Sequence, residues 1–171
     1  MLVSIAISTY EANGNGHYML TKNLQEIYSQ DYPDIEIVIS DHSKDNKIKD
    51  VFERFNKNNK YSIKYFRETE HRGNISFNIN NAIKYCSGDF IKIIFMDDYL
   101  MVYNAISDMV KQFQKNKESK WLVCSYLHTH DYRKLHRIIN PKFNPEMCLG
   151  INTIGSPSNL MFRKEVTERF D

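Results

Sequence analysis

Short apolar runs alternate with longer segments of helical periodicity along this chain. Apolar runs of about four to seven residues predict buried strands, and apolar residues that recur every three or four positions predict amphipathic helices. Strands are expected at residues 2–7, 35–39, 61–66 and 89–95, and helices at residues 17–30, 48–55, 75–86 and 102–114. Strand and helix therefore alternate through the first two thirds of the chain.

This alternation is typical of the α/β class. Because the apolar strands are separated by helices, we expect a mostly parallel sheet covered by helices on both faces, a three-layer α/β/α arrangement. A chain of 171 residues with 42% hydrophobic content is long enough to bury one core. The sequence therefore predicts a single domain over residues 1–171, with ligands at the carboxyl ends of its strands.

Two adjacent carboxylates, Asp97 and Asp98, directly follow the fourth expected strand. Like charges at a strand end are tolerated when a cation such as Mg²⁺ or Mn²⁺, carrying a phosphate, lies between them. A simpler interpretation is a solvated turn in which Asp98 caps the helix expected at residues 102–114. The pattern alone leaves both interpretations open.

Polar clusters also follow the other three expected strands, at residues 8–11, 40–43 and 71–74. Parallel strands place their carboxyl ends at one edge of a sheet, so these clusters should form one site. Asp41 could accept from a base N–H, Arg72 could bind phosphate, and the carboxylate pair could hold a metal ion, which together suit a nucleoside diphosphate. Alternatively, Asp41 could cap the following helix and Arg72 could be a surface charge.

Composition narrows the classes of function. The 23 basic and 21 acidic residues are interleaved and leave a net charge of +2, so no basic stripe indicates a nucleic-acid groove. Three cysteines without a C-x-x-C spacing argue against a secreted disulfide framework and favour a reducing compartment. The apolar start, residues 1–8, is too short for a signal sequence, and without an apolar run of about 18 residues any membrane contact would be peripheral.

Two other motifs are weak. His128 and His130 alternate and could share one face of a strand with a zinc ion, but a third ligand is not evident, so a solvated strand end is favoured. Gly14 and Gly16 form a G-x-G without the third glycine that a nicotinamide-binding loop needs. A nicotinamide-dependent Rossmann domain is therefore disfavoured.

Several segments together resemble family 2 glycosyltransferases of the GT-A fold. They are VSIAISTY at residues 3–10, QDYPDIEIVISDHSKD at 30–45, NINNAI at 78–83, GDFIK at 88–92 and DDYL at 97–100. The segment IGSPSNLMFRKE at residues 154–165 is similar to a later G-x-P-S segment of that family, near the acceptor side. The resemblance covers nearly the whole chain.

The resemblance implies a nucleotide-binding set at the strand ends. Thr9, Tyr10 and Asp41 would hold the base and ribose, with Glu11 at the border of that pocket. Arg72 and Asn80 would lie near the diphosphate. Asp97, together with Asp98, would bind Mn²⁺ or Mg²⁺, and the metal would neutralise the departing nucleoside diphosphate. The nucleotide-binding residues are thus Thr9, Tyr10, Glu11, Asp41, Arg72, Asn80 and Asp97.

The implied activity is inverting transfer of a sugar from a nucleotide-diphosphate donor, a UDP-sugar, to a hydroxyl of a glycan or lipid-linked acceptor. Residues 1–100 would bind the nucleotide, and residues 101–171 would begin the acceptor half. The expected setting is surface polysaccharide biosynthesis in the cytoplasm, at the inner face of the membrane. The sequence does not identify the sugar or the oligomeric state.

Three departures from the family pattern leave an alternative. Ser8 replaces a proline, and Phe95 stands where many relatives carry the first aspartate of D-x-D-D. No residue matches the family's general base, and nothing in the spacing of Glu146, Glu165 and Asp171 marks one as a substitute. We therefore expect a domain truncated before the catalytic base, and the alternative is a catalytically silent module that binds nucleotide sugars.

Overall fold

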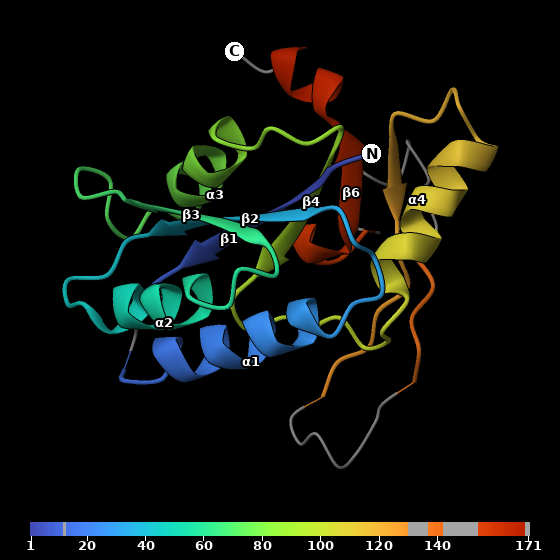
Figure 1. The fold of residues 1–171 in the computed structure, drawn as a ribbon. Helices are drawn as coiled ribbons and strands as arrows, with labels where there is room; N and C mark the ends of the chain where they lie inside the picture. The colour runs from blue at the N-terminus through green and yellow to red at the C-terminus, as the bar shows by residue number, and fades with distance from the viewer. Residues whose placement is uncertain (12, 130–136, 142–153, 170–171) are drawn as a thin grey trace.

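A computed structural model describes residues 1–11, 13–129, 137–141 and 154–169. Within these ranges, six strands form one sheet in the order β3-β2-β1-β4-β6-β5 (Figure 1). The strands are β1 (Val3–Thr9), β2 (Ile35–Asp41), β3 (Ser62–Arg67), β4 (Phe90–Phe95), β5 (Trp121–Val123) and β6 (Leu160–Arg163). The helices are α1 (Gly16–Tyr28), α2 (Lys47–Asn56), α3 (Ile75–Lys84) and α4 (Ala105–Lys115), with short 3₁₀ helices η2 (Pro157–Asn159) and η3 (Lys164–Arg169).

The sheet is mostly parallel, as the sequence predicts. β1 pairs in parallel with both β2 and β4, and β2 pairs in parallel with β3. β6 is antiparallel to β4 and to β5. The alternation of strands and helices in the first two thirds of the chain does not predict this antiparallel part. The carboxyl ends of β1 to β4 therefore lie at one edge.

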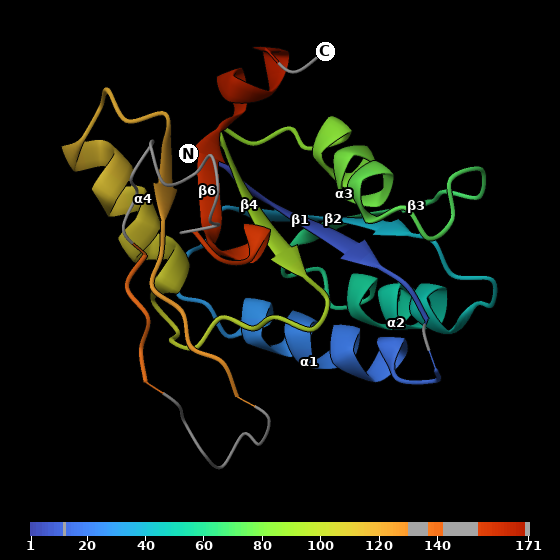
Figure 2. The ribbon, with the colours of Figure 1, turned by 180° about the vertical axis from the view of Figure 1, so that it is seen from behind.

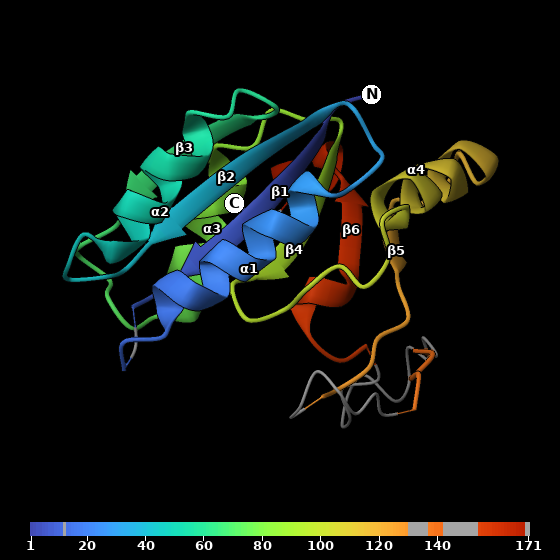
Figure 3. The same ribbon diagram turned by 60° about the horizontal axis from the view of Figure 1, so that its bottom comes forward.

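The expected three layers are confirmed. Val3, Ile5 and Ile7 of β1 pack in the larger core cluster with residues of α1, α2 and α4. Ala6 faces the other way and packs with Ala82 of α3 in a smaller cluster. Because successive side chains of a strand point to opposite faces, α1, α2 and α4 cover one face and α3 covers the other. Figures 2 and 3 show α3 across the sheet from α1 and α2, which lie side by side.

The boundaries differ from the sequence predictions mainly at strand ends. β1 and β2 each run two residues further than expected, since their ladder continues through Ser8↔Ser40 and Thr9↔Asp41. α4 begins at Ala105 with Asn104 before it, three residues later than expected. Asp98 therefore does not cap this helix, and the capping interpretation of the carboxylate pair is wrong.

A buried carboxylate stabilises the edge of the sheet that lies opposite the carboxyl ends of β1 to β4. Glu36 of β2 is 3% exposed. It accepts hydrogen bonds from the side chains of Ser4 and Lys64 and from the backbone N–H groups of Ser87 and Gly88. Although burial alone would raise the pKa of Glu36, these donors hold it at about 2. The charge thus joins β1, β2, β3 and the turn before β4.

Some sequence expectations fall on residues that the structure does not describe. These are the second histidine of the weak zinc motif, His130, and the late carboxylates Glu146 and Asp171. Glu165 is described, and its carboxylate accepts from the Lys120 ammonium at the surface. Among the described residues, no helix is long and apolar enough to cross a membrane.

Candidate functional site

A row of polar side chains crosses the carboxyl ends of three parallel strands. Thr9 of β1 lies opposite Asp41 of β2, and Asp41 lies opposite Arg67 of β3. The Thr9 hydroxyl lies 3.1 Å from the Ser40 carbonyl oxygen and 3.4 Å from Asp41 Oδ1. The register of the sheet therefore brings together two of the sequence-predicted site residues.

Asp41 is the centre of this row and is fully buried. Its Oδ1 accepts the backbone N–H of Ser43 at 2.8 Å. Its Oδ2 accepts the Tyr65 hydroxyl at 2.6 Å and the Arg67 guanidinium at 3.2 Å. Burial and the hydrogen bond to Asp41 raise the pKa of Tyr65, so this phenol stays a donor. Asp41 thus organises the site through these hydrogen bonds. It does not cap α2, because that helix begins only at Lys47.

Arg67 is a site residue that sequence reasoning missed. Besides Asp41, its guanidinium binds the Tyr65 hydroxyl, the Asn46 side chain and the Asp45 carbonyl. It therefore ties the end of β3 to the loop between β2 and α2. Arg72, the predicted phosphate ligand, lies exposed in the loop between β3 and α3.

Glu11 and Tyr10 follow β1 and have different environments. The Glu11 side chain is 3% exposed, and its carboxylate accepts the His17 N–H at 2.6 Å and contacts the His17 ring at 3.1 Å. A negative charge is favourable there, because the first N–H groups of α1 point at it. Tyr10 is 40% exposed, and its backbone N–H donates to Met96 Sδ at 3.5 Å, so the Tyr10 backbone lies beside the residue that follows β4.

Two asparagines of α3 reach the strand ends, but they are not the predicted one. Asn78 donates to the Thr9 carbonyl at 2.9 Å, and Asn81 donates to Ser40 Oγ at 2.9 Å. Asn80 is exposed, and together with Asn81 it lines a cavity between α3 and the sheet. The Thr9 carbonyl also accepts the N–H of His42, whose ring is buried, and burial lowers the pKa of that imidazole. His42 is therefore neutral near pH 7.

The carboxylate pair lies in a tight turn after β4. The Asp98 N–H donates to the Phe95 carbonyl at 3.0 Å, which closes the turn. Buried Asn23 of α1 donates its Nδ2 to the Phe95 carbonyl at 3.1 Å and to the Asp98 carbonyl at 2.6 Å. Asp97 is exposed and Asp98 is half-buried. The turn thus presents one open and one partly sheltered carboxylate.

The turn fits a hard divalent cation that arrives with a phosphate. Within the described ranges, no three His, Cys, Asp or Glu side chains gather as a complete metal cage. Mg²⁺ is usually held by one or two carboxylates together with water and substrate phosphates rather than by such a cage. Asp97 and Asp98 carry oxygen donors of the kind that such an arrangement would use.

Asn23→Ala should lower the free energy of unfolding by about 1–3 kcal/mol, because the Phe95 and Asp98 carbonyl oxygens each lose the hydrogen bond from Asn23. Urea unfolding measures the effect. Gln25→Ala, an exposed position on the same helix, serves as the matched control. Equal stability of the two variants would show that Asn23 does not hold the turn.

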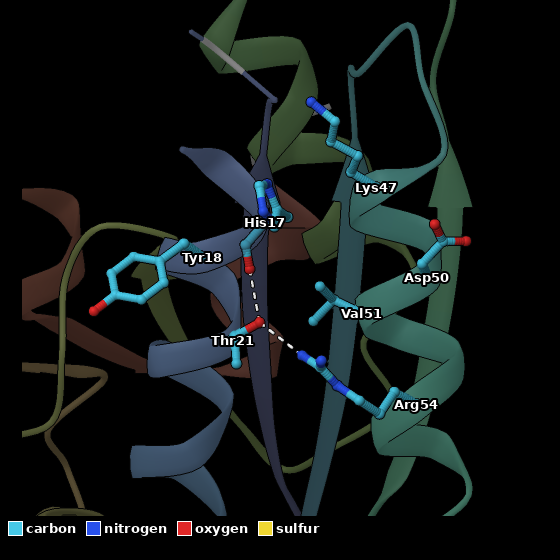
Figure 4. Close-up of a pocket in the computed structure, with 7 residues that line it drawn as sticks. All are labelled: His17, Tyr18, Thr21, Lys47, Asp50, Val51 and Arg54. Atoms are coloured by element: carbon cyan, nitrogen blue, oxygen red, sulfur yellow. Dashed lines mark hydrogen bonds between the residues drawn. The ribbon is translucent and has the colours of Figure 1, made fainter. Parts of the chain in front are cut away.

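Two cavities are found on the described surface. Figure 4 shows the smaller, of about 350 Å³, between α1 and α2, where Arg54 donates to Thr21 Oγ1 and Thr21 donates to the His17 carbonyl. The larger, of about 970 Å³, lies between α3 and the β4–β6 part of the sheet, and Ile93 and Phe162 contribute to its wall. Neither of these two cavities is lined by Asp97 or Asp98.

Known proteins resemble this chain in sequence and in fold. The family profile described as glycosyl transferase family 2 matches residues 4–170. A curated relative, the GalNAc(5)-diNAcBac-PP-undecaprenol beta-1,3-glucosyltransferase of Campylobacter jejuni, is 29% identical over 99 residues, which are 58% of this chain and 30% of the relative. The match therefore spans less than a third of that protein.

Solved structures share the fold over the whole chain. S. aureus TarS 1-349, solved in complex with UDP, has a TM-score of 0.78 at 20% identity, and the match covers 100% of this chain and 49% of that one. The mannosyltransferase PcManGT of Pyrobaculum calidifontis, solved with GDP-Man and Mn²⁺, has a TM-score of 0.70 at 20% identity, over 98% of this chain and 46% of that one. These likenesses confirm the GT-A fold.

Proposed function

Because the chain belongs to glycosyl transferase family 2, we propose that it transfers a sugar from a nucleotide-diphosphate donor to an acceptor hydroxyl. The observation that carries the proposal is the meeting of Thr9, Asp41 and the Asp97–Asp98 turn at one sheet edge. Residues 1–100 would bind the donor, and residues 101–171 would begin the acceptor half.

We propose that the nucleotide binds at the ends of β1 and β2, which would form the wall of its pocket. Tyr10 would cover the base or ribose with its exposed ring, and Arg72 would reach the diphosphate from its loop. Thr9, Glu11 and Asp41 would shape the pocket wall, since all three engage protein partners. Asn80 would approach from α3. A UDP donor is supported by the UDP complex of TarS.

Asp97 and Asp98 would hold Mn²⁺ or Mg²⁺ with the donor diphosphate. When bound, such an ion neutralises the charge that develops on the departing nucleoside diphosphate. The Mn²⁺ in the PcManGT structure supports this assignment. The acceptor hydroxyl would attack the anomeric carbon from the opposite side, with inversion and with a carboxylate as general base. We assign no general base from the described residues, and Glu165 is engaged by Lys120.

The acceptor would be a glycan or a lipid-linked glycan in surface polysaccharide synthesis. The name of the Campylobacter jejuni relative, which includes PP-undecaprenol, supports this class. Transfer would then take place on the cytoplasmic side of a membrane. A catalytically silent donor-binding module is the second candidate, favoured by Phe95 at the position of the first family aspartate.

Calorimetric titration of UDP, with and without Mn²⁺, tests the donor site. We expect UDP binding to be strengthened by Mn²⁺ and to exceed binding of ADP under the same conditions, because the two nucleotides differ only in the base and the part of the site that holds the base should discriminate between them. Absence of UDP binding with or without Mn²⁺ would overturn the donor-site assignment. Release of UDP from a UDP-sugar in the presence of glycan acceptor would then separate the transferase from the silent module.

A further inference from the structure

The segment before β6 contacts the carboxylate turn although the two are distant in the sequence. The Ser156 hydroxyl donates to Asp98 Oδ2 at 3.1 Å, a contact that joins residues 58 positions apart. Ser156 lies in the G-S-P-S segment, outside the residues assigned above to the donor.

The local backbone fixes the direction of this hydroxyl. Ser156 precedes η2, and its Oγ accepts the N–H of Ser158 at 3.2 Å. With that oxygen engaged as an acceptor, the hydroxyl hydrogen is free to point at Asp98. Gly155 has φ +86°, and a Cβ there would lie 2.8 Å from both the Asn159 side chain and the Tyr126 ring. Glycine at this position lets the chain turn tightly into Ser156.

The segment is also attached to β4 itself. Ser158 Oγ accepts the N–H of Phe95, the last residue of β4, at 2.8 Å. The Ser158 carbonyl accepts the ammonium of Lys92, whose side chain is 1% exposed. A buried amine needs such an acceptor, and moving Ser158 away would leave it with the weak acceptor Cys124 Sγ at 3.8 Å. The position of Ser156 is therefore set by β4, which also sets the position of the turn.

We propose that Ser156 is a positioning residue that orients the Asp98 carboxylate for the divalent cation. This inference rests on the proposed function. A carboxylate with one oxygen held by a hydroxyl cannot rotate freely, so its remaining acceptor capacity is presented in one direction. Asn23 holds the backbone of the turn, and Ser156 holds the side chain that the backbone carries.

The test is the Mn²⁺ affinity of Ser156→Ala, measured by electron paramagnetic resonance of free Mn²⁺ at saturating UDP. We expect affinity to fall by about 10-fold to 100-fold, the usual effect of removing a partner of a metal ligand. Ser156→Thr keeps the hydroxyl and should restore most of the affinity. In an Asp98→Ala background, Ser156→Ala should cause no further loss, since the two act on the same ligand.

Ser107→Ala is the matched control, because Ser107 also lies 3.1 Å from a carboxylate oxygen, that of Asp31 before β2. It should leave Mn²⁺ affinity unchanged. Ser156→Ala with unchanged Mn²⁺ affinity and a lower melting temperature would overturn the inference and leave Ser156 as a cap of η2. If the wild-type chain binds UDP but no Mn²⁺, the metal assignment of Asp97 and Asp98 fails first, and the inference fails with it.

Discussion

Replacing Asp97 or Asp98 with alanine is expected to weaken Mn²⁺-dependent UDP binding by about 100-fold or more. Each change removes one of the two carboxylates that the turn after β4 presents. The single carboxylate that remains would hold the cation less tightly, so the cation would bridge the diphosphate to the protein less effectively. Calorimetry with and without Mn²⁺ separates this loss from any change in the nucleotide pocket.

Asp34→Ala is the control for these variants. Asp34 is exposed and precedes β2, at the opposite edge of the sheet, so its loss removes a negative charge without touching the turn. The metal-independent part of UDP binding should persist in Asp97→Ala and Asp98→Ala. Mn²⁺-dependent binding that survives in both single variants would place the metal elsewhere.

Glu36→Gln is expected to cause the largest loss of stability, about 3 kcal/mol at pH 7. The amide cannot accept all the donors that Glu36 now satisfies, and the Lys64 ammonium loses its charged partner. The sign of the pH dependence follows from the depressed pKa. The folded value is about 2 and the ordinary value is 4.5, so the stabilisation is complete above pH 4.5 and is lost as the pH falls toward 2.

Urea unfolding at pH 7 and at about pH 3 measures both effects. The wild-type chain should lose more stability than Glu36→Gln between these two pH values, because the variant has no carboxylate left to protonate there. Glu26→Gln, on the exposed side of α1, is the control and should behave as the wild type. Parallel losses in the wild type and Glu36→Gln would contradict the assignment.

The fold was predictable because its buried strands are nearly unbroken apolar runs. Ile5 and Ile7 in β1, or Ile37 and Ile39 in β2, leave no competing interpretation when helices separate them. The ends of these strands were not predictable, since Thr9 and Asp41 are polar and typical of loops. They belong to the ladder only because each lies opposite the other. β6 was missed as a sheet strand because it is short and pairs with residues far back in the chain.

The candidate site was predictable in outline and not in detail. Asp97 and Asp98 stand out as charges after an apolar strand, but Arg67 resembles an ordinary surface charge until the register places it beside Asp41. Asn23 left one signal in the sequence, because it is a polar residue beside Leu24 on the apolar face of α1. Ser156 lies in the G-x-P-S segment, but that pattern does not pair it with Asp98, since the contact joins residues 58 positions apart.

The strand order has a consequence for how the molecule assembles. β6 lies between β4 and β5 although it follows both in the chain. Among the described strands, β5 pairs only with β6, so β5 has no partner strand until β6 is synthesised. Until then, β4 is an edge strand with unpaired backbone groups. An open edge invites pairing with other chains, and contacts between distant residues form slowly. The parallel strands β1 to β4 can therefore pair early. The antiparallel part of the sheet can form only after β6, which lies between β4 and β5, has been synthesised.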